Sequence, residues 1–330
     1  MIPRSARLKR DPFAKNIEQI PTRNGYGDGV IEAAEKNPNI VVLCADLTES
    51  TRNTDFKKRF PERFVQVGVQ EQLLAACAAG FALAEKIPYI TSYAMFCPGR
   101  AWEQVRTNIS LNQVNVKIIG SHAGVSVGPD GATHQAIEDI AIMRCIPNMT
   151  VIAPCDFHEA RKATVAISKI NGPCYIRFAR EKTPVFTTPK TPFTIGKATV
   201  FHSGTDVAIV ACGPLVHNAL KAAHELKKSG VSVMVINSHT IKPLDEKTIL
   251  SAAKTCGAIV TVEEHQITGG LGGAVSEYLA KTYPTPMEFI GVPNQFGQSG
   301  SPNELIEHYG MGVSHIKNAV RTVLKRKKSV

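Results

Sequence analysis

Aromatic residues are scarce in this chain, and Phe, Tyr and Trp together make up only 6% of its 330 residues. The net charge is +10, but apart from residues 325–328 the basic residues are scattered along the sequence. With few rings to stack on bases and no nucleic-acid-binding motif, we expect no nucleic-acid partner. A diffuse positive charge suits anionic small molecules equally well.

The chain also lacks any apolar run of membrane-spanning length and any Cys-x-x-Cys pair. A helix that crosses a bilayer needs about 20 consecutive apolar residues, so we expect no membrane partner. The first ten residues lack the apolar segment of a secretory signal. Several of the eight cysteines lie inside apolar runs, as Cys44 and Cys212 do. Buried, reduced thiols in a cytoplasmic protein fit this pattern best.

Apolar runs of strand length alternate with amphipathic segments of helical length, and hydrophobic residues make up 43% of the chain. This alternation predicts an α/β protein with two domains, each a mostly parallel sheet flanked by helices. The predicted strands are residues 40–44, 64–67, 87–91, 116–120, 149–154, 174–178, 207–211, 231–237 and 258–263. The predicted helices are residues 25–36, 100–111, 157–169, 215–228 and 245–255, with two more that begin near residue 71 and end at residue 281.

Composition also predicts where the domains begin and end. Residues 1–15 read as a polar N-terminal arm, and residues 181–197 are rich in Pro and Thr, as interdomain linkers often are. We therefore expect a first domain over residues 16–180 and a second over residues 198–330.

The segment that follows the strand at residues 64–67 is the most informative in the chain. Gly68 marks a turn, and a helix begins near Glu71 that consists almost wholly of Ala, Leu, Gly and Cys. Side chains this small let another backbone approach closely, which favours pairing of two such chains here. A carboxylate in the first turn of a helix is favoured by the helix dipole, so Glu71 alone could be a simple helix-start charge.

Residues 121–135 form a glycine-rich loop between a predicted strand and a helix, and the loop carries His122, Asp130 and His134. Loops positioned by a rigid scaffold often carry function. The two histidines lie 134 − 122 = 12 positions apart with no third ligand close by, so the spacing does not favour a zinc site. Imidazoles that face a hydroxyl-rich, anionic substrate suit these residues better.

Two glycine motifs have a structural explanation. Gly27-Asp28-Gly29, with Asn53 downstream, is superficially similar to the motif that holds diphosphate and Mg²⁺ in thiamine-diphosphate enzymes. No apolar strand precedes it, so we predict a helical turn instead. The glycine run at residues 269–273 opens a helix, and we predict tight helix–strand packing there rather than anion binding.

Tyr93 and Phe96 lie just past the strand at residues 87–91. Their spacing fits side chains that cover the end of the core and side chains that offer a stacking surface equally well. Asp46 and Ser50 lie in a polar loop after the strand at residues 40–44. In open α/β sheets, ligands bind at the carboxyl ends of the strands.

Taken together, these stretches resemble the C-terminal portion of transketolase, over nearly all of residues 16–330. The most specific stretch is Gly128-Pro-Asp-Gly-Ala-Thr-His-Gln135, with Arg144-x-x-Pro-Asn148 behind it. The segment Val67-Gly-Val-Gln-Glu-Gln72 is similar to the glutamate motif of the family. Asp46, Ser50 and Arg180, which follows the strand at residues 174–178, match in order and spacing.

The resemblance implies a pyrimidine-binding domain followed by the C-terminal domain of the family. The domain that binds the cofactor diphosphate and Mg²⁺ has no counterpart here. The chain therefore resembles one subunit of a split transketolase, which shares thiamine diphosphate with an N-terminal partner subunit in an α2β2 assembly. Mg²⁺ would be bound mainly by the partner, and the substrates would be sugar phosphates.

The resemblance also implies a role for each matching residue. Glu71 would activate the aminopyrimidine ring of the cofactor, and His122 and His134 would join it in catalysis. The residues implied to bind the cofactor are Glu71, Tyr93, Phe96 and Asp46. The residues implied to bind the substrate are Arg23, Ser50, His122, Asp130, His134 and Arg180.

Three alternatives compete with this interpretation. The β-type subunit of a 2-oxo-acid dehydrogenase has a similar length, domain order and glutamate, but the motif at residues 130–134 argues against it. Deoxyxylulose-phosphate synthase normally keeps its domains in one chain. A catalytically silent paralogue would not need Glu71 together with the residues of the 121–135 loop. The physiological sugar stays open, between the pentose phosphate pathway and specialised sugar catabolism.

Overall fold

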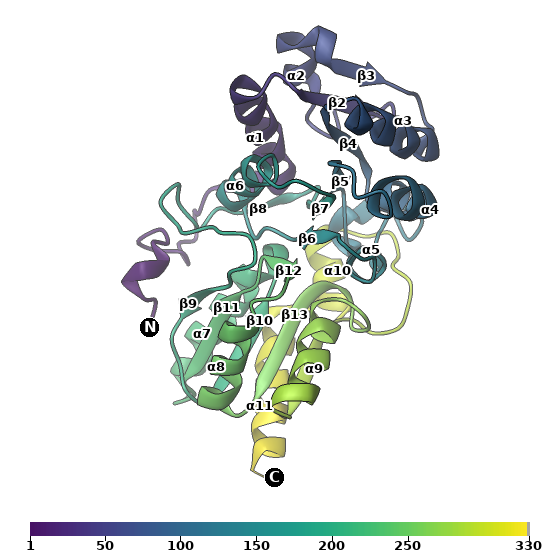
Figure 1. The fold of residues 1–330 in the computed structure, drawn as a ribbon. Helices are drawn as coiled ribbons and strands as arrows, with labels where there is room; N and C mark the ends of the chain where they lie inside the picture. The colour runs from purple at the N-terminus through teal and green to yellow at the C-terminus, as the bar shows by residue number, and fades with distance from the viewer. Residues whose placement is uncertain (329–330) are drawn as a thin grey trace.

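The computed structural model describes residues 1–328, and a seven-stranded sheet organises the first half of the chain (Figure 1). The strand order is β12-β6-β7-β5-β4-β2-β3, and every neighbouring pair is parallel except β12 with β6. The strands are β2 (Ile40–Cys44), β3 (Phe64–Gln66), β4 (Ile87–Tyr93), β5 (Lys117–Ser121), β6 (Thr150–Ile152), β7 (Cys174–Arg177) and β12 (Thr240–Lys242).

Helices cover both faces of this sheet, which is why its strands read as continuous apolar runs. On one face Val42 of β2 packs in a core with α1 (Thr22–Lys36) and α6 (Phe157–Ile167). On the other face Leu43 packs in a core with α3 (Glu71–Leu83) and α5 (Asp139–Arg144). The short helices α2 (Thr54–Arg59) and α4 (Trp102–Gln104) complete this half of the fold.

Glycine allows α1 and α6 to approach closely. A Cβ atom on Gly25 would lie 2.4 Å from the carbonyl oxygen of Phe157, and one on Gly29 would lie 2.8 Å from that of Arg161. Asp28 and its flanking glycines lie inside α1. The expectation that this motif is helical is therefore confirmed.

A five-stranded sheet organises the second half, with the order β14-β13-β10-β11-β9 and only β9 antiparallel to its neighbour. Its strands are β9 (Thr199–His202), β10 (Val207–Ala211), β11 (Val233–Asn237), β13 (Ile259–Gln266) and β14 (Met287–Val292). The helices are α7 (Val216–Lys227), α8 (Glu246–Cys256), α9 (Leu271–Thr282), α10 (Pro302–His308) and α11 (Val313–Lys327). The α/β prediction of two mostly parallel sheets is confirmed.

The core between the two halves is continuous. Side chains from α8 and α9 belong to the same apolar cluster as those from α3 and α5, whereas α7 and α11 cover the opposite face of the second sheet. The bottom half of Figure 1 shows α7, α8, α9 and α11 around the second sheet. The two halves therefore pack against one another and share a hydrophobic core.

Several segments differ from the sequence-based expectation. The helix expected at residues 100–111 is irregular, with π-helical segments at Met95–Arg100 and Val105–Ser110 on either side of α4. The expected linker contains β8 (Lys182–Pro184), which pairs with β1 (Gln19–Pro21).

The N-terminal arm is held by the chain itself. Ala6 is fully buried in the core of the second half, and the backbone N–H of Lys9 donates to the carbonyl of Phe186.

All eight cysteines are free thiols, and six of them are buried. Within residues 1–328, every helix is too short or too polar to cross a bilayer.

Candidate active site

The predicted site residues gather at the carboxyl ends of the parallel strands of the first sheet. Tyr93 ends β4, His122 follows β5 directly, and Arg180 comes three residues after β7. Arg23 reaches the same edge from the first turn of α1. Residues that are up to 157 positions apart in sequence, from Arg23 to Arg180, therefore meet because strand ends share one edge of a sheet.

Glu71 starts α3, and only 1% of its surface is exposed. The hydroxyl of Ser92 donates to its Oε1 at 3.1 Å, and Nη1 of Arg100 donates to its Oε2 at 2.7 Å. A buried carboxylate needs partners of this kind. Arg100 is itself 49% exposed, so the Glu71 carboxylate lies just beneath a solvent-accessible surface.

Four rings form one cluster, which Arg100 links to this carboxylate. Tyr93 stacks on His122 with ring centroids 3.9 Å apart and lies 6.3 Å from Phe96 in a near-parallel arrangement. His134 meets Phe96 edge-on at 5.2 Å. The structure thus brings both predicted histidines and both predicted aromatic residues together, and Phe96 is only half-buried.

His122 is held in one protonation state. Its side chain is buried, and burial, followed by the nearby cations Arg23, Arg180 and Arg52, lowers its pKa from 6.5 to about 2. Nε2 of His122 lies 3.2 Å from Nη1 of Arg23, which can only donate a hydrogen bond. The imidazole is therefore neutral and offers a substrate no charge.

Arginines supply the positive charge of the site. Burial, followed by the neighbouring cations Arg52 and Arg180, lowers the pKa of Arg23. Arg23 also donates to the carbonyl of Ser50 at 2.8 Å. Arg180 donates to the carbonyl of Val127 at 2.8 Å and pairs with Asp130 at 3.1 Å. Mutually repelling cations at one edge of the sheet form a natural site for an anion.

The glycine-rich loop at residues 121–135 is braced by the second half of the chain. Nε2 of Gln135, directly after His134, donates to the carbonyls of Val125 and Gln298, each at 3.0 Å. A Cβ on Gly297 would lie only 1.7 Å from Oε1 of Gln135, so the two loops are in tight contact. The second half therefore fixes the loop that carries Asp130 and His134.

Asp46 follows the carboxyl end of β2, at the same edge of the sheet. Its side chain is exposed, and within residues 1–328 its carboxylate makes no hydrogen bond to Glu71 or to the ring cluster. Its backbone has a φ of 58°, in the left-handed region, as do Arg52 at 62° and His122 at 55°. Backbone strain of about 1–3 kcal/mol per residue concentrates at functional sites.

Ser92, Arg100 and Arg52 could not be identified as site residues from the sequence. Ser92 and Arg100 become relevant only because β4 and the π-helical turn after it fold over the start of α3. Arg52 donates from Nε to the side chain of Asn24 at 2.9 Å, next to Arg23 in sequence. Hydrophobic periodicity does not reveal contacts of this kind.

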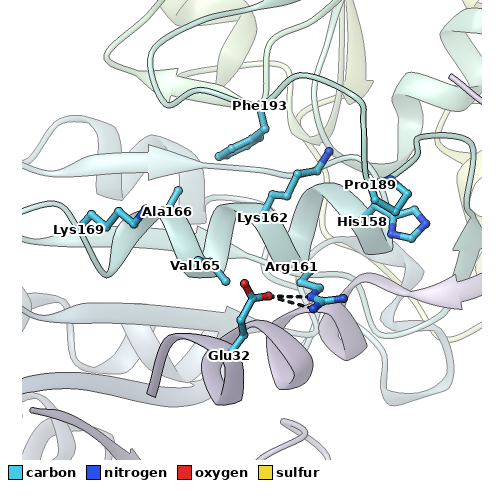
Figure 2. A pocket seen from close by; sticks show the side chains of 9 residues that line it. All are labelled: Glu32, His158, Arg161, Lys162, Val165, Ala166, Lys169, Pro189 and Phe193. Carbon is cyan, nitrogen blue, oxygen red and sulfur yellow. Dashed lines mark hydrogen bonds and ion pairs between the residues drawn. The ribbon is translucent and has the colours of Figure 1, made fainter. Parts of the chain in front are cut away.

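A separate cavity of about 500 Å³ runs along the outer face of α6 (Figure 2). Its cations are largely engaged, since Arg161 pairs with Glu32 at 3.0 Å and Lys162 donates to the carbonyls of Thr188 and Thr191. None of the predicted site residues lines it. We therefore assign the functional site to the strand ends and not to this cavity.

The glycine run before α9 also has a structural role. The backbone N–H groups of Leu271 and Gly272 donate to the carboxylate of Glu263 at 2.7 and 2.8 Å. A Cβ on Gly272 would lie 2.7 Å from the ring of Phe289. The expected tight helix–strand packing is confirmed, and the amides that could bind an anion are already engaged by Glu263.

Comparisons with known proteins agree with this geometry. The family model described as "Transketolase, pyrimidine binding domain" matches residues 18–185, and "Transketolase, C-terminal domain" matches residues 196–316. This two-domain α/β chain therefore belongs to the transketolase family. It corresponds to the C-terminal section of that family, and its similarity to separately encoded subunits is extensive.

Three relatives are similar along nearly their whole length. A protein of Methanocaldococcus jannaschii, provisionally named a transketolase C-terminal section, is 43% identical over 92% of this chain and 96% of its own. The 6-deoxy-6-sulfo-D-fructose transketolase subunit SqwH of Clostridium sp. is 38% identical over 96% and 98%. A subunit of the apulose-4-phosphate transketolase of Phocaeicola vulgatus is 36% identical over 93% and 98%.

A solved structure titled "Split gene transketolase, inactive beta4 tetramer" superimposes with a TM-score of 0.88. It is 42% identical and covers 93% of this chain and 99% of its own. At that identity and coverage, the likeness extends to the whole subunit.

Proposed function

We propose that this chain is the C-terminal subunit of a thiamine-diphosphate-dependent transketolase. The complete enzyme would move a two-carbon ketol group reversibly from a ketose phosphate to an aldose phosphate. The observation that carries the proposal is the buried Glu71 carboxylate, which Arg100 links to the ring cluster because its guanidinium also lies over the Phe96 ring.

The residues present fit the aminopyrimidine end of the cofactor. Glu71 offers a buried carboxylate to a ring nitrogen, and Tyr93 and Phe96 offer flat surfaces against which a ring can stack. When bound, the thiazolium ring of thiamine diphosphate supplies the electron sink for breaking and forming the carbon–carbon bond. Asp46 is the fourth residue that we assign to cofactor binding.

The diphosphate and Mg²⁺ belong, in this proposal, mainly to a partner subunit. Asp28 and its glycines lie inside α1, and within residues 1–328 no group of three His, Cys, Asp or Glu side chains is placed to hold a metal. An N-terminal transketolase subunit would supply these ligands. Eight free thiols suit the reducing cytoplasm, where we place the enzyme.

Each side chain of the site then has a task that its geometry permits. Glu71 holds a proton against the ring nitrogen N1′ of the cofactor. His122, which is neutral, exchanges its hydrogen bond with Arg23 for one with the substrate near its reacting carbon. His134 and Asp130 contact sugar hydroxyl groups. The groups that bind the terminal phosphate are Arg23, Ser50 and Arg180, because a guanidinium matches a phosphate with two parallel hydrogen bonds.

The substrate would carry a terminal anion, whichever sugar it is. One relative is named for a sulfonated sugar and another for a phosphorylated one. Both anions present three oxygens to arginine, so the same pocket chemistry serves either. A panel of phosphorylated and sulfonated ketoses would identify the physiological donor.

The exposed face of α3 supports assembly into an α2β2 tetramer. Leu73 and Leu83 are 43% and 73% exposed, and a Cβ on Gly80 between them would meet nothing within 4 Å. A helix face that is apolar and left open marks an interaction surface. Because α3 begins with Glu71, association at this face would place two sites close to one subunit boundary.

The decisive experiment is reconstitution. This chain is mixed with an N-terminal transketolase subunit, thiamine diphosphate and Mg²⁺, and two-carbon transfer between sugar phosphates is measured. We expect activity from the mixture and none from either subunit alone. Full activity of this chain by itself would contradict the proposal, and acyl transfer to lipoamide would favour a 2-oxo-acid dehydrogenase subunit instead.

A further inference from the structure

Arg100 makes two contacts with the residues assigned to the cofactor ring. Its Nη1 donates to Oε2 of Glu71 at 2.7 Å, and its guanidinium carbon lies 4.7 Å from the centre of the Phe96 ring. One planar group therefore engages the carboxylate and an aromatic surface at the same time.

These are the two contacts that the proposed function gives to the aminopyrimidine. A guanidinium is flat, delocalised and rich in N–H donors, so it stacks on aromatic rings and pairs with carboxylates. A protonated aminopyrimidine has the same attributes, namely a flat ring, a shared positive charge and an N–H directed at a carboxylate. The two groups cannot occupy one position together.

We propose that Arg100 stands in for the aminopyrimidine ring in the cofactor-free subunit and must leave Glu71 when the cofactor binds. The inference rests on the proposed function, because it assigns the ring to Glu71 and Phe96. It adds a residue that competes with the cofactor, and it gives the Glu71–Arg100 ion pair a purpose.

The position of Arg100 suits a group that moves. Its side chain is 49% exposed, whereas that of Glu71 is 1% exposed, so Arg100 is the partner that can turn into solvent without opening the packed interior. Arg100 ends the π-helical segment Met95–Arg100, and π-helical turns occur frequently at functional sites. Its departure would uncover the face of Phe96 and the outer oxygen of Glu71 together.

The contact with Arg100 also explains how the cofactor-free chain accommodates the buried carboxylate of Glu71. An unpaired buried carboxylate is destabilising, and Ser92 satisfies only one of its two oxygens. Arg100 satisfies the other until the ring of the cofactor arrives. The pairing therefore protects the empty site at the expense of cofactor affinity.

The first test measures binding of the isolated ring to the isolated chain. The probe is 4-amino-5-hydroxymethyl-2-methylpyrimidine, titrated calorimetrically into the wild type and into Arg100→Met. We expect Arg100→Met to bind about tenfold more tightly, since one charge-assisted hydrogen bond no longer has to be broken. Arg100→Lys, which keeps the charge but not the flat fork, should fall between the two. Equal or weaker binding by Arg100→Met overturns the inference.

Arg106→Met is the matched control, because Arg106 is exposed on the same irregular helical stretch and has no ion pair with Glu71. It should bind the probe as the wild type does. If Arg100→Met fails to fold, the wild type still tests the idea through modification by phenylglyoxal. Arg100 should react several-fold faster when the probe is bound, and an unchanged or slower reaction overturns the inference.

The second test separates this inference from the proposed function. Thiamine diphosphate is titrated into the wild-type and Arg100→Met chains, each reconstituted with the N-terminal subunit and Mg²⁺. If the wild-type complex binds the cofactor and Arg100→Met binds it no more tightly, the inference fails and the function stands. If the wild-type complex binds no cofactor, the function itself fails.

Discussion

Nη1 of Arg23 lies 3.2 Å from Nε2 of His122, and this contact fixes the tautomer of the histidine. An arginine can only donate, so Nε2 accepts and the ring proton must reside on Nδ1. Nδ1 lies 2.8 Å from the hydroxyl oxygen of Ser121 and donates a hydrogen bond to it. The imidazole is therefore held on both sides, and its role in the site depends on its staying neutral.

The first prediction follows from this arrangement. Burial and three arginines lower the pKa of His122 to about 2, so the ring should not titrate between pH 5 and 8. Labelling histidines with ¹³C and recording their ring resonances against pH in the isolated chain would show this. The His122→Gln variant identifies the resonance by its loss. A midpoint above pH 5 for that resonance would refute the prediction.

The second prediction concerns the proposed acid–base residue. Replacing Glu71 by Ala should lower the turnover of the reconstituted enzyme by about 10²–10⁴, the range usual for general acid–base groups. Glu71→Gln keeps the shape of the side chain but cannot share a proton, so it should be similarly impaired. Glu103→Gln, an exposed residue on α4, is the control. Turnover within a few-fold of wild type, with cofactor bound, would remove Glu71 from the mechanism.

A third prediction concerns stability and pH. Glu159 of α6 accepts hydrogen bonds from the backbone N–H of Cys155 and from the side chain of Asn237 at the end of β11, each at 2.7 Å. Burial raises the pKa of Glu159 from 4.5 to about 7. The folded state therefore binds this proton more tightly than the unfolded state, and the free energy of unfolding should fall as pH rises from about 4.5 to 7.

The fall attributable to Glu159 should reach about 3 kcal/mol. Urea denaturation at several pH values and one protein concentration would measure it. Glu159→Gln should flatten this part of the pH profile, whereas the exposed Glu49→Gln should leave it intact. An unaltered profile in Glu159→Gln would show that other groups cause the dependence.

A fourth prediction concerns the packing of α1 on α6. Gly25→Ala would push a methyl group to within 2.4 Å of the carbonyl oxygen of Phe157, so the backbones must separate. Overpacking of this kind costs about 1–3 kcal/mol, which thermal unfolding would detect as a lower midpoint. Gly273→Ala in α9 meets its nearest neighbour at 3.6 Å and should be neutral or slightly stabilising. Equal midpoints for the two variants would disprove the close approach of the two helices.

The sequence predicted the parallel strands well, because a strand buried on both faces is an unbroken apolar run, as residues 40–44 show. Family-like motifs also indicated most of the residues that converge at the sheet edge. Arg100 was not predicted as a site residue, because its pairing with Glu71 depends on the fold of an irregular turn. Hydrophobic periodicity in the sequence does not predict such a turn. The edge strands β9, β12 and β14 were not predicted, and β9 and β12 are short and defined by their partners.

The antiparallel strand β12 has a consequence for dissecting this protein. Although it lies within the second half in sequence order, it closes the β6 edge of the first sheet. A fragment that stops after residue 197 would lack β12, so the backbone N–H and C=O groups along the edge of β6 would be unpaired. These groups could pair with a strand of another molecule, so the fragment should aggregate. Gene truncations meant to isolate the first domain should therefore retain Thr240–Lys242, grafted or supplied as a peptide.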